Sequence, residues 1–206
     1  MSTLRTRRWK WLWAAPGLML VALSIAGLYR NKTLGRALEI VCAGHELEVR
    51  GDIAAALEQY RAAVAIQPRF PYGLALLGNA YHQLGEDDKA IESYKRALTF
   101  SPRHFWVHYL LGQLYRDQGR YQEAIAKFNE LLTMKDNWYQ SNQGLGYVQY
   151  QQLAYGELGH CYAKLGETRK AVEAYQQYLT LNPSAKDRAV VEEYIQRATG
   201  NSAEGR

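Results

Sequence analysis

Two histidines four residues apart, His104 and His108, come closest in this sequence to a metal site. Residues at this spacing can share one face of a helix, where two imidazoles could hold a metal ion. No glutamate lies beside them to complete a metalloprotease motif, and His104 falls at a boundary between segments, before a predicted helix begins. We therefore expect no metal site.

The second candidate for chemistry is the neighbouring pair His160 and Cys161. Adjacent helical residues point in different directions, so a catalytic pair would need a partner elsewhere, and none is evident. The sequence also has no phosphate-binding glycine loop, no nucleophile elbow and no pair of carboxylates in a plausible pocket. It therefore predicts a protein that is not an enzyme, with no catalytic residues, no cofactor and no small-molecule substrate.

The charge distribution argues against a nucleic-acid partner. The chain has 206 residues and a formal net charge of +5. Five of its 25 basic residues lie within residues 1–30, which contain no acid, so 20 basic residues face 20 acidic ones in the remainder. A nucleic-acid-binding domain concentrates cations on the surface that meets phosphate. In this sequence the excess of basic residues is confined to residues 1–30.

Residues 11–29 form an uncharged, apolar run that follows a basic tail at 1–10. As a helix the run spans about 28 Å, close to the hydrocarbon thickness of a bilayer. Trp9, Trp11 and Trp13 lie at or just before the start of the run, and Tyr29 is its last residue. Aromatic rings of this kind favour the membrane interface. The sequence thus predicts a single-pass transmembrane helix, joined by a short connector at 30–36 to the rest of the chain.

Two alternatives to an anchor remain open. Ser24 and Ala26 have the small-residue spacing of a signal-peptide cleavage site, and residues 6–10 resemble a twin-arginine address. For an anchor, the cations before the apolar run favour a cytoplasmic N-terminus and an extracytoplasmic or periplasmic main domain. The opposite orientation, with the main domain in the cytoplasm, is the alternative.

A period of 34 residues organises the chain after residue 36. One block has Leu74, Leu77, Gly78 and Tyr81 at fixed spacing, followed by Gly85. The blocks are 37–70, 71–104, 105–138 and 152–183. Their shared positions are Gly44, Gly78, Gly112 and Gly159, then Gly51, Gly85, Gly119 and Gly166, then Ala56, Ala90, Ala124 and Ala171, and finally Tyr60, Tyr94, Phe128 and Tyr175.

This pattern resembles the tetratricopeptide repeat (TPR) family. The resemblance implies an all-α solenoid of four helix pairs over residues 37–183. In each pair, one glycine would end the first helix in a left-handed conformation, and the other would allow close packing. Cys42 and Cys161 fall in the first and last units, too far apart for a disulfide, and are expected to be small packing residues.

Two segments extend the four units. Residues 184–199 carry an apolar stripe after a capping-box pattern at Ser184 and Asp187, and predict a capping helix ahead of a flexible tail at 200–206. Residues 139–151 are thirteen extra residues without charge. They are either a longer loop with an early start of the next helix, or an insertion that contacts a partner through Tyr139, Tyr147 and Tyr150.

The resemblance also implies where a partner binds. In this family a concave groove is lined by the second, fifth, ninth, twelfth and thirteenth positions of each first helix. In this sequence, the family's groove positions include His45 in the first unit and His160 in the fourth. The predicted binding residues in the middle of the groove are Tyr72, Asn79, His82, Trp106, Tyr109, Gln113 and Arg116. Only Asn79 fits the family's carboxylate clamp, so we do not expect that mode of binding.

These features together predict a membrane-tethered adaptor that binds a protein, through a peptide segment, a helix or a subunit of a membrane complex. It would hold or assemble that complex, and the tether would raise the local concentration of the array. The alternative is a soluble periplasmic or secreted TPR protein, released by cleavage near Ala26, that binds a peptide or a glycan.

Overall fold

The computed structural model describes residues 32–134 and 137–204, and the side chains of 137–147 and 201–204 lie outside that description. The described residues form helices and no strand. The first helix covers residues 32–49. The helices that follow are α2 (Ile53–Ile66), α3 (Pro71–Gln83), α4 (Asp87–Phe100), α5 (Phe105–Asp117), α6 (Tyr121–Leu132), α7 (Asn137–Lys164), α8 (Thr168–Leu181) and α9 (Arg188–Glu204).

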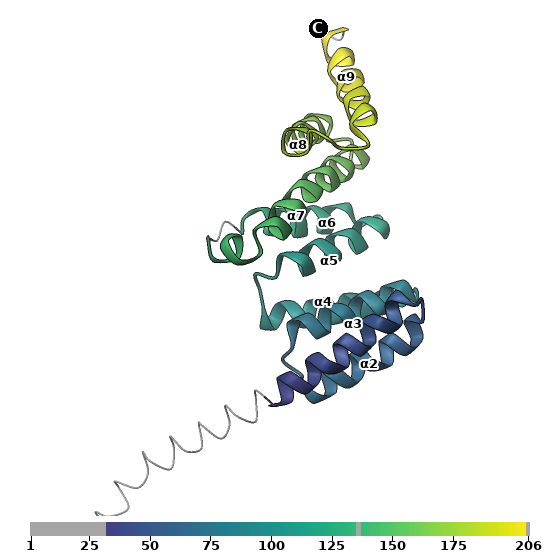
Figure 1. The fold of residues 1–206 in the computed structure, drawn as a ribbon. Coiled ribbons are helices and arrows are strands. Elements are labelled where there is room, and N and C mark those ends of the chain that lie inside the picture. The colour runs from purple at the N-terminus through teal and green to yellow at the C-terminus, as the bar shows by residue number, and fades with distance from the viewer. Residues whose placement is uncertain (1–31, 135–136, 205–206) are drawn as a thin grey trace, which may run out of the picture.

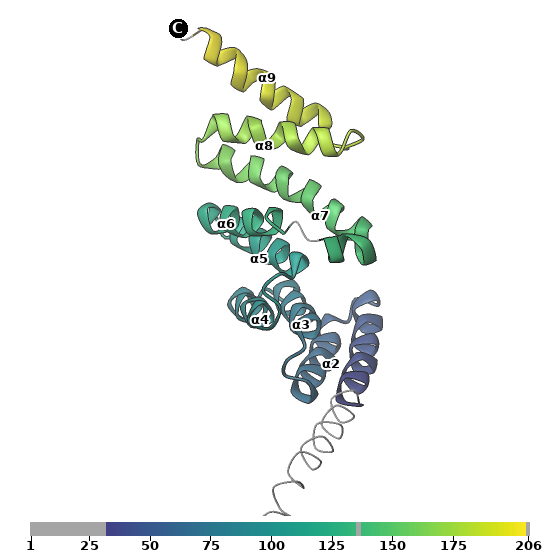
Figure 2. The same ribbon diagram turned by 90° about the vertical axis from the view of Figure 1, so that its left-hand side faces the viewer.

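The helices stack one after another into an elongated array (Figures 1 and 2). Within each unit the first and second helices are antiparallel, and each second helix packs against the first helix of the next unit. The first helices of the last two units, α5 and α7, also contact each other. The predicted all-α TPR solenoid is confirmed for this part of the chain.

A glycine facing an aromatic ring holds each helix pair together. A Cβ atom at Gly112 of α5 would lie 2.6 Å from Cε1 of Phe128 on α6, whose side chain is fully buried. The same pairing joins Gly44 to Tyr60, Gly78 to Tyr94 and Gly159 to Tyr175. The close approach is therefore between a first helix and the ring of its own second helix.

The turns inside the units have one geometry. Gly51, Gly85, Gly119 and Gly166 have φ between 73° and 85°. An L side chain is strained in this left-handed region, so glycine lets the chain reverse without cost. The amide of Gly119 donates to the carbonyl of Arg116 at 2.9 Å, and the amide of Arg120 donates to Tyr115 at 2.8 Å. This is the helix ending expected from the sequence.

The extra thirteen residues are helical. α7 runs without interruption from Asn137 to Lys164, so residues 139–151 extend the first helix of the fourth unit and do not form a loop. No described helix is long and apolar enough to cross a membrane, and the segment predicted to do so, 11–29, lies outside the described residues.

The capping helix starts later than the sequence pattern suggests. α9 begins at Arg188, and the carbonyl of Asp187 accepts from the amide of Val191 at 3.1 Å. The Asp187 carboxylate is not part of a capping box with Ser184, because it accepts from the hydroxyl of Tyr178 at 2.7 Å. α9 continues to Glu204, so most of the segment 200–206 predicted as a tail is helical.

Candidate functional site

The seven predicted binding residues lie on α3 and α5, but the structure separates them into different environments. Tyr72 and Trp106 stand at the starts of these helices. Asn79, Gln113 and Arg116 lie further along and are held by two glutamates. The remaining two residues, Tyr109 and His82, are engaged in contacts within the array.

The aromatic pair lies at the edge of the array where the units are connected. The ring centroids of Tyr72 and Trp106 are 5.8 Å apart, and Tyr72 is 45% exposed. Phe100 is 43% exposed at the end of α4, and the guanidinium of Arg69 lies 5.9 Å from its ring centroid. We call the residues Arg69, Tyr72, Phe100, Arg103 and Trp106 of the α2–α3 and α4–α5 connections the aromatic rim.

Glu48 joins the first unit to the second. Its Oε1 accepts from Nδ2 of Asn79 at 3.3 Å and from Nε2 of Gln83 at 2.6 Å. Its Oε2 accepts from the hydroxyl of Tyr60 at 2.7 Å. Burial, followed by this hydrogen bond to Glu48, raises the pKa of Tyr60 well above its usual range. The carboxylate therefore holds the side chain of Asn79, one of the predicted groove residues.

Glu157 joins the third unit to the fourth through hydrogen bonds, as Glu48 joins the first unit to the second. It accepts from Nη1 of Arg116, from Nε2 of Gln113 at 3.2 Å and from the hydroxyl of Tyr109 at 3.4 Å. Burial lowers the pKa of Arg116, but its bonds to Glu157 and Asp117 outweigh this, so the pKa lies above its ordinary value. Three donors on α5 thus converge on one acid of α7.

The sequence analysis did not identify Glu157 as a site residue. It lies outside the groove positions of the family pattern, and its partners are 41 to 48 residues away. One signal was available: Glu157 and Lys164 are the only charged residues between 137 and 164. An isolated acid in such a segment is expected to have a partner when it is buried.

Tyr109 is buried, whereas His82 keeps an exposed side chain and contacts Asp87. Tyr109 is only 7% exposed, and its ring packs edge-on against Tyr150 with centroids 5.1 Å apart. Nδ1 of His82 lies 2.8 Å from Oδ1 of Asp87, across the turn of the second unit. Tyr150 is half-buried and also packs against Phe105. The side chains of Tyr139 and Tyr147 lie outside the described residues.

The two histidines near the α4–α5 connection are structural. His108 is 4% exposed, with Nε2 placed 2.8 Å from the carbonyl of Pro102, to which it donates, and Nδ1 3.1 Å from Oε2 of Glu130. Burial lowers the pKa of His104 to about 4, with a smaller contribution from the nearby His108. No group of three potential metal ligands occurs among the described residues.

The two cysteines differ from each other. Cys161 is fully buried, as expected of a packing residue, and burial raises the pKa of its thiol to about 12, so it is not a thiolate nucleophile. Cys42 is exposed, which contradicts the expectation that it packs inside the array. Both are free thiols.

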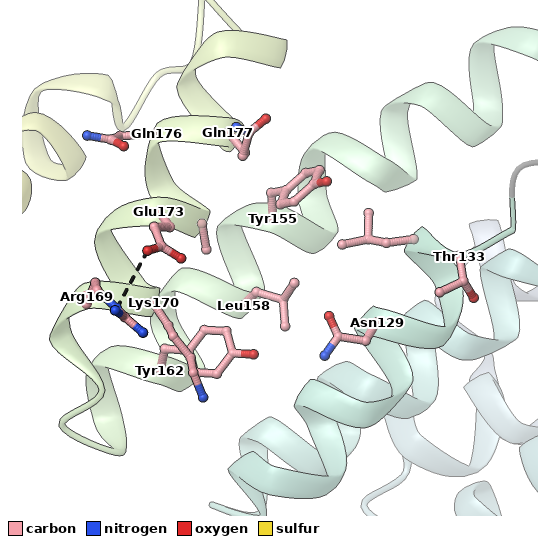
Figure 3. Close-up of a pocket in the computed structure, with 12 residues that line it drawn as sticks. Asn129, Thr133, Tyr155, Leu158, Tyr162, Arg169, Lys170, Glu173, Gln176 and Gln177 are labelled. Carbon is pink, nitrogen blue, oxygen red and sulfur yellow. Dashed lines mark ion pairs between the residues drawn. The ribbon is translucent and has the colours of Figure 1, made fainter.

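A cleft of about 950 Å³ lies between α6, α7 and α8 (Figure 3). Tyr155, Leu158 and Tyr162 of α7 face it, and Arg169 and Glu173 of α8 form an ion pair at 3.7 Å beside it. None of the seven predicted groove residues lines this cleft. It is a second surface, and its mixed lining presents no catalytic arrangement.

Comparison with known families identifies the repeats. Profiles described as TPR repeat or tetratricopeptide repeat match residues 44–85, 78–115, 105–138 and 153–185. Together they cover more than half of the chain, which therefore belongs to the tetratricopeptide repeat family. A comparison with curated protein sequences gives no significant match.

Solved structures support the same fold. The structure from a functional characterization of pilF of Pseudomonas aeruginosa is 21% identical, with a TM-score of 0.65 over 82% of this chain and 69% of that one. A crystal structure of MamA is 22% identical, with a TM-score of 0.60 over 78% and 95%. A tetratricopeptide repeat protein from Parabacteroides merdae is 22% identical, with a TM-score of 0.63 over 82% and 62%. At these identities the likeness concerns the fold alone.

Proposed function

We propose that this chain is a membrane-tethered adaptor that binds a protein partner in the groove formed by its first helices and supports a membrane-associated complex. The observation that carries the proposal is the pair of glutamate-centred clusters, which hold polar side chains in place along this groove. Tetratricopeptide repeat proteins are typically interaction scaffolds, and the described residues present no arrangement suited to catalysis.

The groove floor suits the backbone of an extended peptide or the polar face of a helix. Asn79 and Gln113 each donate through their amide nitrogen to a glutamate. A side-chain amide has two donor hydrogens and an acceptor oxygen, so each keeps capacity for a partner. Because the glutamates fix these side chains before binding, the partner meets a surface that needs little ordering.

The tether is proposed from residues 11–29. Their length, lack of charge and terminal aromatic residues match a membrane-spanning helix. A tethered array would be concentrated near partners in the same membrane, so a modest affinity for each would suffice. We place the N-terminus in the cytoplasm and the array outside it, on the excess of cations before the apolar run.

Site-specific photo-crosslinking of the full-length chain in native membranes tests this proposal. A photoreactive amino acid is placed at His45 or His160, which are exposed on first helices, or at Glu92 or Glu173, which are exposed on second helices. We expect a common crosslinked protein from the first two positions and none from the other two. The same product from all four positions, or from Glu92 and Glu173 alone, would contradict a groove site.

A further inference from the structure

The aromatic rim exposes apolar surface at the edge of the array, where Tyr72 and Trp106, two of the predicted groove residues, stand at the starts of α3 and α5. The ring centroids of Phe70 and Tyr72 are 6.1 Å apart, and those of Tyr72 and Trp106 are 5.8 Å apart, so aromatic rings run from the end of the first unit to the start of the third. Tyr72 and Phe100 are 45% and 43% exposed, and Arg69 and Arg103 are exposed beside them. Aromatic rings with adjacent arginines are the combination that favours a lipid headgroup layer.

The two edges of the array differ in charge. The connections that carry the rim, 67–70 and 101–104, contain an arginine each and no acid. At the opposite edge, the residues within two positions of the four turn glycines include five acids and three basic residues: Asp52, Glu86, Asp87, Asp117 and Glu167, with Arg50, Arg120 and Lys164. The rim connections thus carry a net charge of +2 and the turns a net charge of −2, so an anionic surface would favour the rim edge over the turn edge.

The rim also lies on the side of the array where the 32–49 helix begins (Figure 1). The α2–α3 and α4–α5 connections lie on the same side as the start of the 32–49 helix, because successive first helices run in the same direction (Figure 1). Lys32 and Arg36 are exposed at that start, and Leu38 is 43% exposed. The chain between Tyr29 and Lys32 can span at most about 11 Å.

We propose that the aromatic rim rests in the headgroup layer of an anionic bilayer, the same bilayer that residues 11–29 enter. This inference rests on the tether proposed above. It orients the array with the inter-unit edge of its first three units on the membrane and the glycine turns directed away. The groove floor, with Asn79 and Gln113, then stays open to a protein partner beside the membrane.

Tryptophan quenching in vesicles tests the orientation. The full-length chain is given a single tryptophan at Trp106 by changing Trp9, Trp11, Trp13 and Trp138 to Phe. A matched control also carries Trp106→Phe with Leu84→Trp, because Leu84 is 41% exposed at the opposite edge. Both chains are reconstituted into phosphatidylcholine–phosphatidylglycerol vesicles whose acyl chains are brominated close to the headgroup. Bromine quenches only tryptophans that lie against it.

We expect bromination at least to halve the emission of Trp106 and to leave that of the Leu84→Trp control unchanged. Equal quenching of both, or of neither, in a chain that floats with the vesicles overturns the orientation and leaves the tether intact. A chain that does not float with vesicles overturns the tether and this inference with it. A rim that is unquenched in vesicles but crosslinks to a protein in native membranes is a protein-docking surface, which also overturns the inference.

The rim arginines provide an independent check. Replacing Arg69 and Arg103 with Gln removes two charges from the rim and should weaken its docking to the anionic surface about thirtyfold. The matched variant replaces Arg50 and Arg169, which are 73% and 87% exposed and lie near the glycine turns. We expect only the first variant to lose quenching of Trp106. Equal loss in both would mean that net charge, and not the rim, positions the array.

Discussion

Gly112→Ala tests the packing that holds each helix pair together. A Cβ atom at this position would lie 2.6 Å from Cε1 and 2.8 Å from Cζ of Phe128. Ordinary contacts begin near 3.4 Å, so the ring would have to move by about 0.8 Å. Phe128 has no exposed surface, so the ring cannot relieve the clash by turning out into solvent.

The expected loss follows from two opposing effects. Overpacking a buried site costs about 1–3 kcal/mol, whereas replacing a helical glycine with alanine gains about 1 kcal/mol. With the strain near its upper value, the free energy of unfolding falls by about 2 kcal/mol, or about 4–8 °C in Tm for a domain of this size. The matched control is Gly35→Ala in the 32–49 helix, where the added Cβ meets nothing within 4 Å.

Urea unfolding of the full-length chain in mild detergent, followed by far-ultraviolet circular dichroism, measures both variants. We expect Gly112→Ala to lower the midpoint and Gly35→Ala to raise it. Phe128→Leu removes the two clashing ring atoms, so the double variant should lose less stability than the sum of the single changes. If Gly112→Ala stabilises the chain as Gly35→Ala does, the ring does not lie against this glycine and the packing argument fails.

Three further predictions use the same unfolding assay. Glu157→Gln should cost about 2 kcal/mol, because it weakens a partly buried bond to Arg116, while the exposed Glu173→Gln should cost less than about 0.5 kcal/mol; equal losses would refute the role of the Glu157 cluster. Gly119→Ala should cost about 1 kcal/mol because φ is +73° there, and no loss would show that the turn relaxes. Burial lowers the pKa of His104 from 6.5 to about 4, so His104 takes up a proton in the unfolded chain at a higher pH than in the folded chain. The free energy of unfolding should therefore drop by about 2 kcal/mol between pH 7 and 5. An equally large drop in the His104→Gln variant would refute this.

Much of the fold follows from the sequence because its determinants are local and repeated. Gly119 and its equivalents predict the turns, since a left-handed residue at a helix end favours glycine whatever surrounds it. A glycine at the position of Gly112 and an aromatic residue at the position of Phe128 recur in every unit, which predicts that both positions are tightly packed but does not predict that they meet within one unit.

The binding surface was predicted less well because it depends on contacts between units. Glu157 receives donors from another helix, and no local pattern marks that pairing. Tyr109 was expected to face a partner, but the extension of α7 brings Tyr150 against it. Ser184 was expected to start the last helix, but Asp187 precedes that start and bonds Tyr178 instead. In each case a residue on another helix decided the outcome.

The central claim is that the groove floor binds the protein partner. The decisive measurement is the Kd of the full-length chain for the protein captured by crosslinking from His45 and His160. Asn79→Ala with Gln113→Ala removes two amides yet leaves Glu48 and Glu157 with other donors. Each lost hydrogen bond contributes about 1 kcal/mol, so we predict a Kd about thirtyfold higher.

The control for that measurement removes two exposed polar side chains from second helices, through Glu92→Ala and Gln122→Ala. Circular dichroism first confirms that both double variants are folded. The account predicts an unchanged Kd for this control beside the weakened binding of the groove variant. Equal affinities for the wild type and the groove variant would contradict the account and place the partner site elsewhere on the array.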